Sequence, residues 1–210
     1  MITSGQTGVP AGGNIPSGNQ NTPFRQINTG ELGVSEIHGR YYESSARGGR
    51  FGGANQAAQA VTAAFALTYT GLVLYNPNGS TVNGVLEKVG IGNSVVWPAA
   101  SVIGLMVGQS TTALSGLTAL TPKSKKLGSG LTPICGLASA ATLPLAPTLD
   151  TVLASIGTVA TTSYETTMGV FDVGGDIVIP PGGYAAIYST VALTAAGIFS
   201  FQWEEVAIAA

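Results

Sequence analysis

Short apolar runs separated by turn-forming residues dominate the chain from residue 54 onward. Runs of this kind that recur about every ten residues, with Gly, Pro, Asn and Ser between them, are typical of an antiparallel sandwich or barrel. Their number is sufficient for two packed sheets, and we therefore predict an all-β sandwich. The strand candidates are residues 61–69, 72–75, 85–91, 94–97, 102–107, 166–173, 176–179, 184–188 and 197–206.

The C-terminal part contains the two most distinct local patterns. Strand candidates 176–179 and 184–188 flank a Pro-Pro-Gly-Gly sequence at 180–183, which predicts a hairpin because prolines cannot donate to a ladder and glycines supply turn angles. In the final strand Phe199, Phe201 and Trp203 alternate with other residues and so share one face. We expect this aromatic face to lie in the core.

The region 109–162 has a less distinct pattern. It contains four prolines, and its run 148–160 fits a short helix with Leu149, Val152, Leu153 and Ile156 on one side. A further pair of strands fits the same residues, because short apolar runs do not distinguish the periodicity of a helix from that of a strand. Residues 76–80, in contrast, have the composition of a strong turn between two strands.

The composition changes near residue 53, which divides the chain into an extended N-terminal arm, 1–53, and a sandwich domain, 54–210. The opening of the arm has too few large apolar side chains to offset the entropy of ordering a core of its own. Its second half intersperses aromatic residues with arginines, the residue types that favour interface anchors. Packing of this half against its own domain is the alternative, and the glycines of 48–53 are interpreted as a hinge.

The chain has very few charges. Only 9% of its residues are charged, against roughly 25% in a typical soluble protein, and it contains 30 glycines. A surface of hydroxyls and small side chains costs little to desolvate, which favours a subunit of an assembly. A net charge of −2 gives no general attraction for nucleic acid. The uncharged stretch between Lys88 and Lys123 is broken by polar residues and prolines, so we expect no membrane insertion.

Candidate chemistry is sparse, and we predict no enzyme, no cofactor and no metal site. The single Cys135 excludes an intrachain disulfide and is expected to be a buried thiol. His38, the only histidine, has no cysteine near it in the sequence. The pair Asp172 and Asp176 is interpreted as part of a hydrated turn.

Lys123, Lys125 and Lys126 form the only basic cluster, with a solvated loop as the default interpretation. The adjacent Glu204 and Glu205 leave opposite faces of a strand, where they cannot form a catalytic dyad. The N-terminus lacks the basic and apolar regions of a secretory signal, so we expect synthesis in the cytoplasm.

Three stretches together resemble a known class of protein: 72–80 leading into 85–90, then 175–187, then 199–206. In one-letter code they read LVLYNPNGS with VLEKVG, GDIVIPPGGYAAI, and FSFQWEEV. The combination is similar to the head cement or decoration proteins of tailed bacteriophages, which are capsid-stabilising virion proteins. The resemblance covers roughly residues 47–210 and leaves most of the arm unmatched.

This resemblance implies a jelly-roll-like sandwich that binds the outside of the phage capsid and reinforces contacts between major capsid protein subunits. It also implies a homo-oligomer, either a trimer or a dimer, located at the capsid surface of the virion and made in the host cytoplasm. Within that hypothesis the arginines can form forked contacts with capsid carboxylates. The preferred capsid and subunit contacts are Phe24, Arg25, Arg40, Tyr41, Tyr42, Arg47, Arg50 and Phe51. Alanine at Arg47 together with Arg50 is expected to weaken capsid occupancy without unfolding the free protein.

The alternative function is a receptor-binding or carbohydrate-binding module of a phage tail fibre or spike, because sandwiches display loops and aromatic rings stack on sugars. An exposed Trp97 or Tyr164 lining a groove favours that alternative.

Overall fold

A computed structural model describes residues 39–93, 97, 99–156 and 169–208. The chain divides into two compact units, Met1–Tyr42 and Glu43–Ala210. In the described part of the first unit, the guanidinium carbon of Arg40 lies 5.1 Å from the ring centre of Tyr41. The short helix α1, Tyr42–Arg47, spans the boundary between the units.

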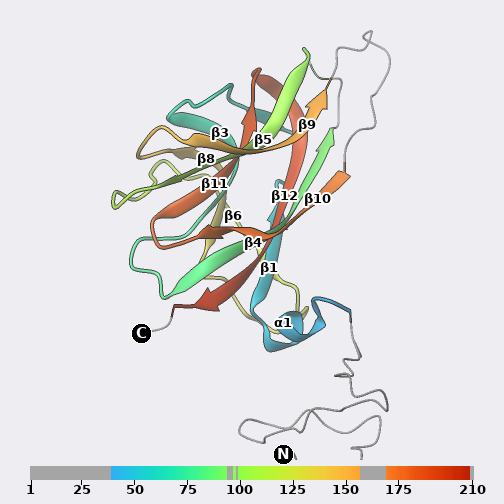
Figure 1. Cartoon of the computed structure of the whole chain (residues 1–210), viewed down its shortest axis with the longest axis vertical. Helices are drawn as coiled ribbons and strands as arrows, with labels where there is room; N and C mark the ends of the chain where they lie inside the picture. Colours follow the sequence, from blue (N-terminus) through green and yellow to red (C-terminus); the bar gives the residue numbers. More distant parts are fainter. Residues whose placement is uncertain (1–38, 94–96, 98, 157–168, 209–210) are drawn as a thin grey trace, which may run out of the picture. The chain divides into compact units, whose positions relative to one another are not determined.

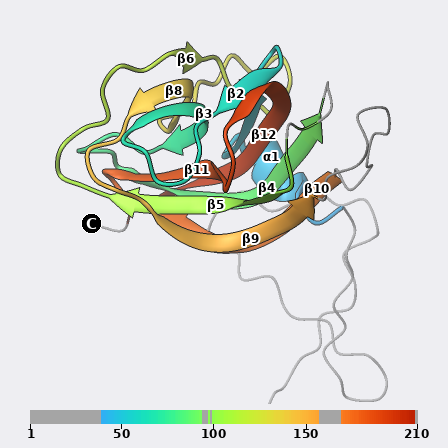
Figure 2. The same cartoon turned by 90° about the horizontal axis from the view of Figure 1, so that it is seen from above.

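The second unit is all-β and consists of two antiparallel sheets, as predicted (Figures 1 and 2). The first sheet has the strand order β10-β4-β12-β1-β7, and β2 also pairs with β12. Its strands are β1 Arg50–Ala54, β2 Gln59–Val61, β4 Val82–Asn93, β7 Lys123–Ser124, β10 Gly169–Ile179 and β12 Leu193–Ala207. The second sheet has the order β6-β8-β3-β11-β5-β9. Its strands are β3 Thr68–Tyr75, β5 Ser101–Gln109, β6 Ala119–Leu120, β8 Gly136–Thr142, β9 Thr148–Ile156 and β11 Gly183–Ser189.

The region 109–162, in which the sequence pattern fits either a helix or strands, contains strands in its described part. Residues 148–156 are β9, paired with β5, and 136–142 are β8, paired with β3. The helical alternative for 148–156 is therefore wrong, because pairing with β5 satisfies the backbone in extended form; residues 157–160 lie outside the described residues. The predicted strand 61–69 is two strands, β2 and β3, joined by a loop in which Ala64 has a φ of 54°. Of the candidate 94–97, only Trp97 is described.

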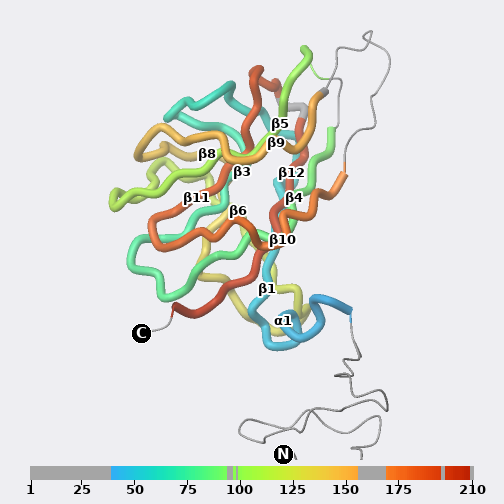
Figure 3. Tube along the Cα trace, viewed as in Figure 1, coloured from blue at the N-terminus to red at the C-terminus, as the bar shows by residue number. Residues whose placement is uncertain are grey.

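The predicted hairpin of 176–188 is a corner between the sheets. Strand β10 pairs with β4 in the first sheet, whereas β11 pairs with β3 and β5 in the second. The chain does turn at the Pro-Pro-Gly-Gly sequence, where the Gly183 amide donates to the Pro180 carbonyl at 2.8 Å. The trace in Figure 3 shows the chain passing from one layer to the other at this point. Turn chemistry specifies that the chain reverses, but the sheet that the next strand joins depends on distant partners.

Asn76 joins this corner to the turn that follows β3. Its backbone exchanges hydrogen bonds with Gly182 and Gly183, each 2.9 Å long. Its side-chain amide donates to the carbonyl of Val82 at 2.7 Å and to that of Ile179 at 3.0 Å. The buried Asn76 therefore binds two segments at which the chain changes sheets.

The core lies between the sheets, and the aromatic face of β12 belongs to it as predicted. Phe199, Phe201 and Trp203 are fully buried. Phe51 is buried as well, with its ring centre 6.2 Å from that of Trp203. The predicted boundary at residue 53 is therefore misplaced, because β1 lies between β12 and β7 and supplies a core residue. For the same reason Gly52 and Gly53 are strand residues and not a hinge.

Candidate functional site

Of the residues predicted to contact a capsid, the second unit contains Arg47, Arg50 and Phe51, which differ in their exposure. Phe24 and Arg25 lie outside the described residues, and Arg40, Tyr41 and Tyr42 belong to the first unit. Arg47 has a side chain that is 78% exposed and forms a helical ion pair of 3.9 Å with Glu43. Arg50 and Phe51 are buried in the sandwich, so the alternative of packing against the chain's own domain holds for these two.

Arg50 of β1 is held by the carboxylate of Glu87 in β4, and β12 lies between these two strands. The Nε of Arg50 donates to both oxygens of Glu87, at 2.9 and 2.7 Å, and a terminal nitrogen also binds that carboxylate. Arg50 and Glu87 are 5% and 6% exposed. The second terminal nitrogen donates to the hydroxyl of Ser45 in α1 at 3.4 Å. Arg50 thus fastens α1 to the outer side of the first sheet.

A bulge in β4 places Glu87 in this position. Gln202 of β12 pairs with Lys88, and the next residue, Trp203, pairs with Leu86, so Glu87 is the extra residue. An extra residue in one strand re-aims its side chain, here toward Arg50. Burial, together with the charge of Glu87, raises the pKa of Glu204, which lies opposite Arg50 on β12. No motif in the sequence pairs residues 50 and 87, and this ion pair was missed.

The predicted lysine cluster makes contacts within its own chain. The ammonium of Lys126 donates to the carbonyl of Ala46 at 2.9 Å. The side chain of Lys125 lies over Gly52, whose missing Cβ leaves room for it. Burial, followed by the proximity of Arg50, lowers the pKa of Lys125. Lys125 and Lys126 are nevertheless exposed, in agreement with the interpretation as a solvated loop.

The outer face of the first sheet carries exposed apolar side chains. Val170 and Val178 of β10 are 65% and 51% exposed, and Ile198 and Val206 of β12 are also exposed. The register places Val170 beside Gly90 and Val178 beside Val85, on the face opposite the core. The open face of an antiparallel sheet is usually polar, so apolar side chains here mark a candidate interaction surface. We call this surface the outer face.

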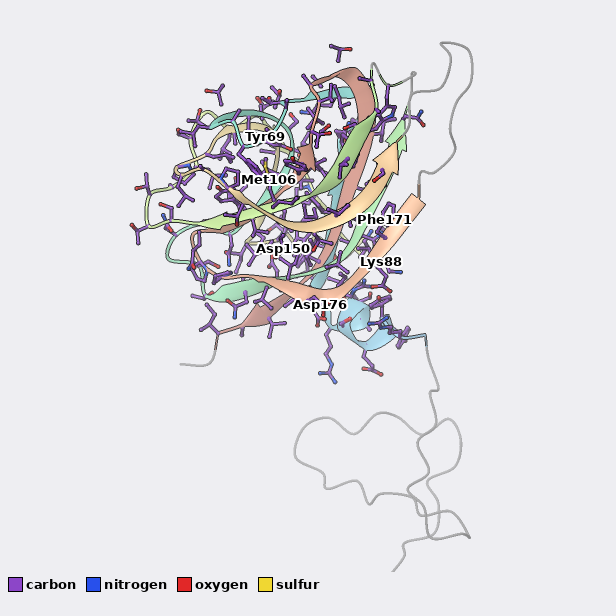
Figure 4. All side chains as sticks on the ribbon, turned by 45° about the horizontal axis from the view of Figure 1, so that its top comes forward. Tyr69, Lys88, Met106, Asp150, Phe171 and Asp176 are labelled. Carbon is purple, nitrogen blue, oxygen red and sulfur yellow. The ribbon has the colours of Figure 1, made fainter. Side chains whose placement is uncertain are left out.

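A groove opens where the two sheets end on the same side. Strand β10 is the last strand of the first sheet and β9 is the last strand of the second. The groove between them has a volume of about 400 Å³ and is lined by residues of β5, β9, β10 and β11 and by Pro180. Val107, Ile177 and Ile179 supply apolar lining, and Asp150 and Asp176 supply carboxylates. Figure 4 shows these two aspartates on the facing strands. We call this feature the edge groove.

Two glycines between Asp172 and Asp176 precede the part of β10 that lines the edge groove. Gly174 and Gly175 have φ values of 68° and 89°, and the pairing with β4 skips from Asp172 to Ile177. The Asp172 carboxylate accepts the Gly174 amide at 2.9 Å. Positive φ at both residues is readily available only to glycine, so this sequence specifies an irregularity within β10. The interpretation as a hydrated turn missed that the strand continues through it.

The other candidate residues from the sequence do not form a site in the described part of the chain. Cys135 is buried, and burial, with the nearby Glu205 carboxylate, raises the pKa of its thiol. Glu205 accepts the backbone amides of Ile134 at 3.1 Å and Cys135 at 2.8 Å. Trp97 is 8% exposed, so it is not the exposed aromatic residue that favours sugar binding. His38 and Tyr164 lie outside the described residues, within which no group of three metal-ligating side chains occurs.

No protein-family model, curated protein or solved structure matches the chain. Within the described ranges, no helix is both long enough and apolar enough to cross a membrane.

Proposed function

We propose that this chain is a structural virion protein that binds the outside of a tailed-phage capsid and reinforces contacts between major capsid protein subunits. The observation that carries the proposal is the outer face, where Val170, Val178, Ile198 and Val206 are exposed on a sheet that is otherwise well packed. The open face of an antiparallel sheet is usually polar, and exposed apolar side chains on it favour contact with a protein partner.

The low charge of the chain supports the same proposal. Val170, Gly90 and Ser200 form one cross-strand row of the outer face, and covering such a row costs far less than burying unpaired charges. The central charged pair of this face, Lys88 and Asp172, lies directly opposite across the β4 and β10 ladder. Opposite charges facing each other in this way reduce the cost of covering that part of the face.

The strand order supports the jelly-roll assignment that belongs to this proposal. Strands β3, β4 and β5 alternate between the two sheets, and β9, β10, β11 and β12 do so again. In the first sheet, the last strand, β12, lies between β4 and the early strand β1. Repeated crossing between two antiparallel sheets is the arrangement of jelly rolls, which are common in viral capsid proteins.

Imaging the virion by electron cryomicroscopy tests the proposal. The expected result is density for this chain repeated over the shell, with the outer face against another protein subunit. Density confined to the tail or its fibres refutes the capsid role and moves the function to attachment.

A matched pair of variants tests the surface itself. Val170→Lys places a charge on the outer face at a residue that does not line the edge groove, whereas Val152→Lys places one on exposed β9 of the other sheet. Particle occupancy is expected to fall for the first and not for the second, with both proteins folded by circular dichroism. Equal occupancy of the two variants contradicts the assignment of the outer face.

A further inference from the structure

The strands that border the edge groove have open backbone edges. In the described part of the chain, β10 pairs only with β4 and β9 pairs only with β5, so each strand has one edge without a partner strand. Proteins commonly protect such edges with charged side chains, prolines or bulges. In β10 the aspartates and the Gly174–Gly175 irregularity precede residue 177, and residues 177–179 have none of these features. An open edge of this kind is a template for a strand from another chain.

The C-terminal part of β10 is the more regular template. Ile177, Val178 and Ile179 pair without interruption with Leu86, Val85 and Gly84. Strand β9, in contrast, has register shifts opposite Ile103–Gly104 and Leu105–Met106, which disturb the spacing of its backbone groups. An added strand is therefore better accommodated by residues 177–179 than by β9.

The lining of the edge groove defines the chemistry of an occupant. Val107 and Ile177 offer apolar surface, and Asp150 and Asp176 offer two carboxylates, whereas no Lys or Arg lines the groove. The Asp150 carboxylate also accepts the hydroxyl of Thr151 at 2.6 Å, which helps to orient it. A long aliphatic side chain that ends in a cation satisfies both parts of this lining, because Lys and Arg bury their stems and keep the charged group at a polar rim.

We propose that the edge groove binds an extended segment of a partner protein that carries a Lys or Arg between β-branched residues. The backbone of the segment pairs with residues 177–179, and its cation lies between Asp150 and Asp176. This inference rests on the proposed function, since it names the kind of segment that a neighbouring subunit contributes.

A synthetic peptide tests the inference without any capsid. The probe is a fluorescein-labelled, acetylated and amidated Thr-Val-Lys-Val-Thr peptide, compared with the same peptide carrying Glu in place of Lys. Fluorescence anisotropy with the full chain is expected to show binding of the Lys peptide and at least about fivefold weaker binding of the Glu peptide, as expected for one or two exposed ion pairs.

Matched variants locate the bound peptide. Asp150→Asn with Asp176→Asn is expected to weaken binding of the Lys peptide about threefold to tenfold, in the range for the loss of two such pairs. Asp172→Asn also removes a negative charge from β10, but Asp172 does not line the groove. This control variant is expected to leave the affinity for the Lys peptide unchanged. N-methylation of both valines blocks backbone pairing and is expected to abolish binding.

The inference is overturned if the Lys and Glu peptides bind equally, if neither binds at millimolar concentration, or if Asp172→Asn weakens binding as much as the groove variant. It is also overturned if the groove variant abolishes self-association in analytical ultracentrifugation, because the occupant is then a second copy of this chain. Each of these results leaves the capsid proposal standing, since that proposal depends on the particle image.

Discussion

Glu87→Ala is expected to destabilise the sandwich strongly, although the residue lies on the outer side of a sheet. The substitution leaves the Arg50 guanidinium buried, at 5% exposure, without the carboxylate that accepts its Nε and a terminal nitrogen. Breaking one side of a buried ion pair costs about 3–5 kcal/mol, a large part of the roughly 5–15 kcal/mol that stabilises a typical domain. For a domain of this size the loss corresponds to a fall in Tm of roughly 6–20 °C.

Urea unfolding followed by tryptophan fluorescence measures this loss, because Trp203 is fully buried in the adjacent core. Arg47→Ala is the matched control, since Arg47 is exposed and its ion pair of 3.9 Å is expected to contribute less than about 0.5 kcal/mol. The double replacement Arg50→Met with Glu87→Leu is expected to recover most of the stability, because no charge is left buried without a partner.

A loss below about 1 kcal/mol for Glu87→Ala refutes the reasoning, as does a double replacement that is no more stable than the single variant. The expected result also changes the interpretation of the sequence-based test at Arg47 and Arg50. Reduced capsid occupancy in a variant that includes Arg50→Ala follows from lost folding and does not identify a capsid contact.

Three further predictions concern single buried groups. Cys135 is expected to react with an aromatic disulfide reagent at pH 8 only after urea unfolding, because burial raises the pKa of its thiol; rapid reaction of the folded protein contradicts this. Tyr184 has a pKa raised from 10.0 to about 12 by burial, so its contribution to stability is present below pH 10 and is lost as the pH rises toward 12. Between pH 9 and 12 the urea midpoint is expected to fall less steeply for Tyr184→Phe than for the unsubstituted protein. Parallel pH profiles contradict a raised pKa at Tyr184. Asn76→Ala is expected to cost about 1–3 kcal/mol in urea unfolding, because the Ile179 and Val82 carbonyls lose their donor; Asn78→Ala, which removes a bond at the exposed turn, is the control.

Strong local signals in the sequence predicted much of the fold. The alternation of Phe199, Phe201 and Trp203 placed one face of β12 in the core, because a strand with this period can bury only one set of side chains. The isolated Cys135 was predicted to be buried, and it is. These features need no knowledge of distant residues.

The candidate sites were much less predictable. Arg50 and Glu87 are 37 positions apart and meet because β1 and β4 both flank β12 and because β4 bulges at Glu87. Asp150 and Asp176 line one groove because two edge strands end on the same side. The arginines and aromatic residues of 47–51 have the composition of interface anchors, a signal that does not distinguish a partner's surface from the chain's own sheet.

The amino-acid sequence by itself determined the class of structure: short alternating apolar runs specify strands, Gly and Pro specify where the chain turns, and scarce charge leaves a surface that is easily covered. The tertiary structure alone decided that the turn at 180–182 is a corner between sheets, that Arg50 is an internal anchor, and that β9 and β10 enclose a groove. The physical reason is that periodicity and turn chemistry act over a few residues. Strand order and edge position, in contrast, follow from packing the whole set of strands around one core.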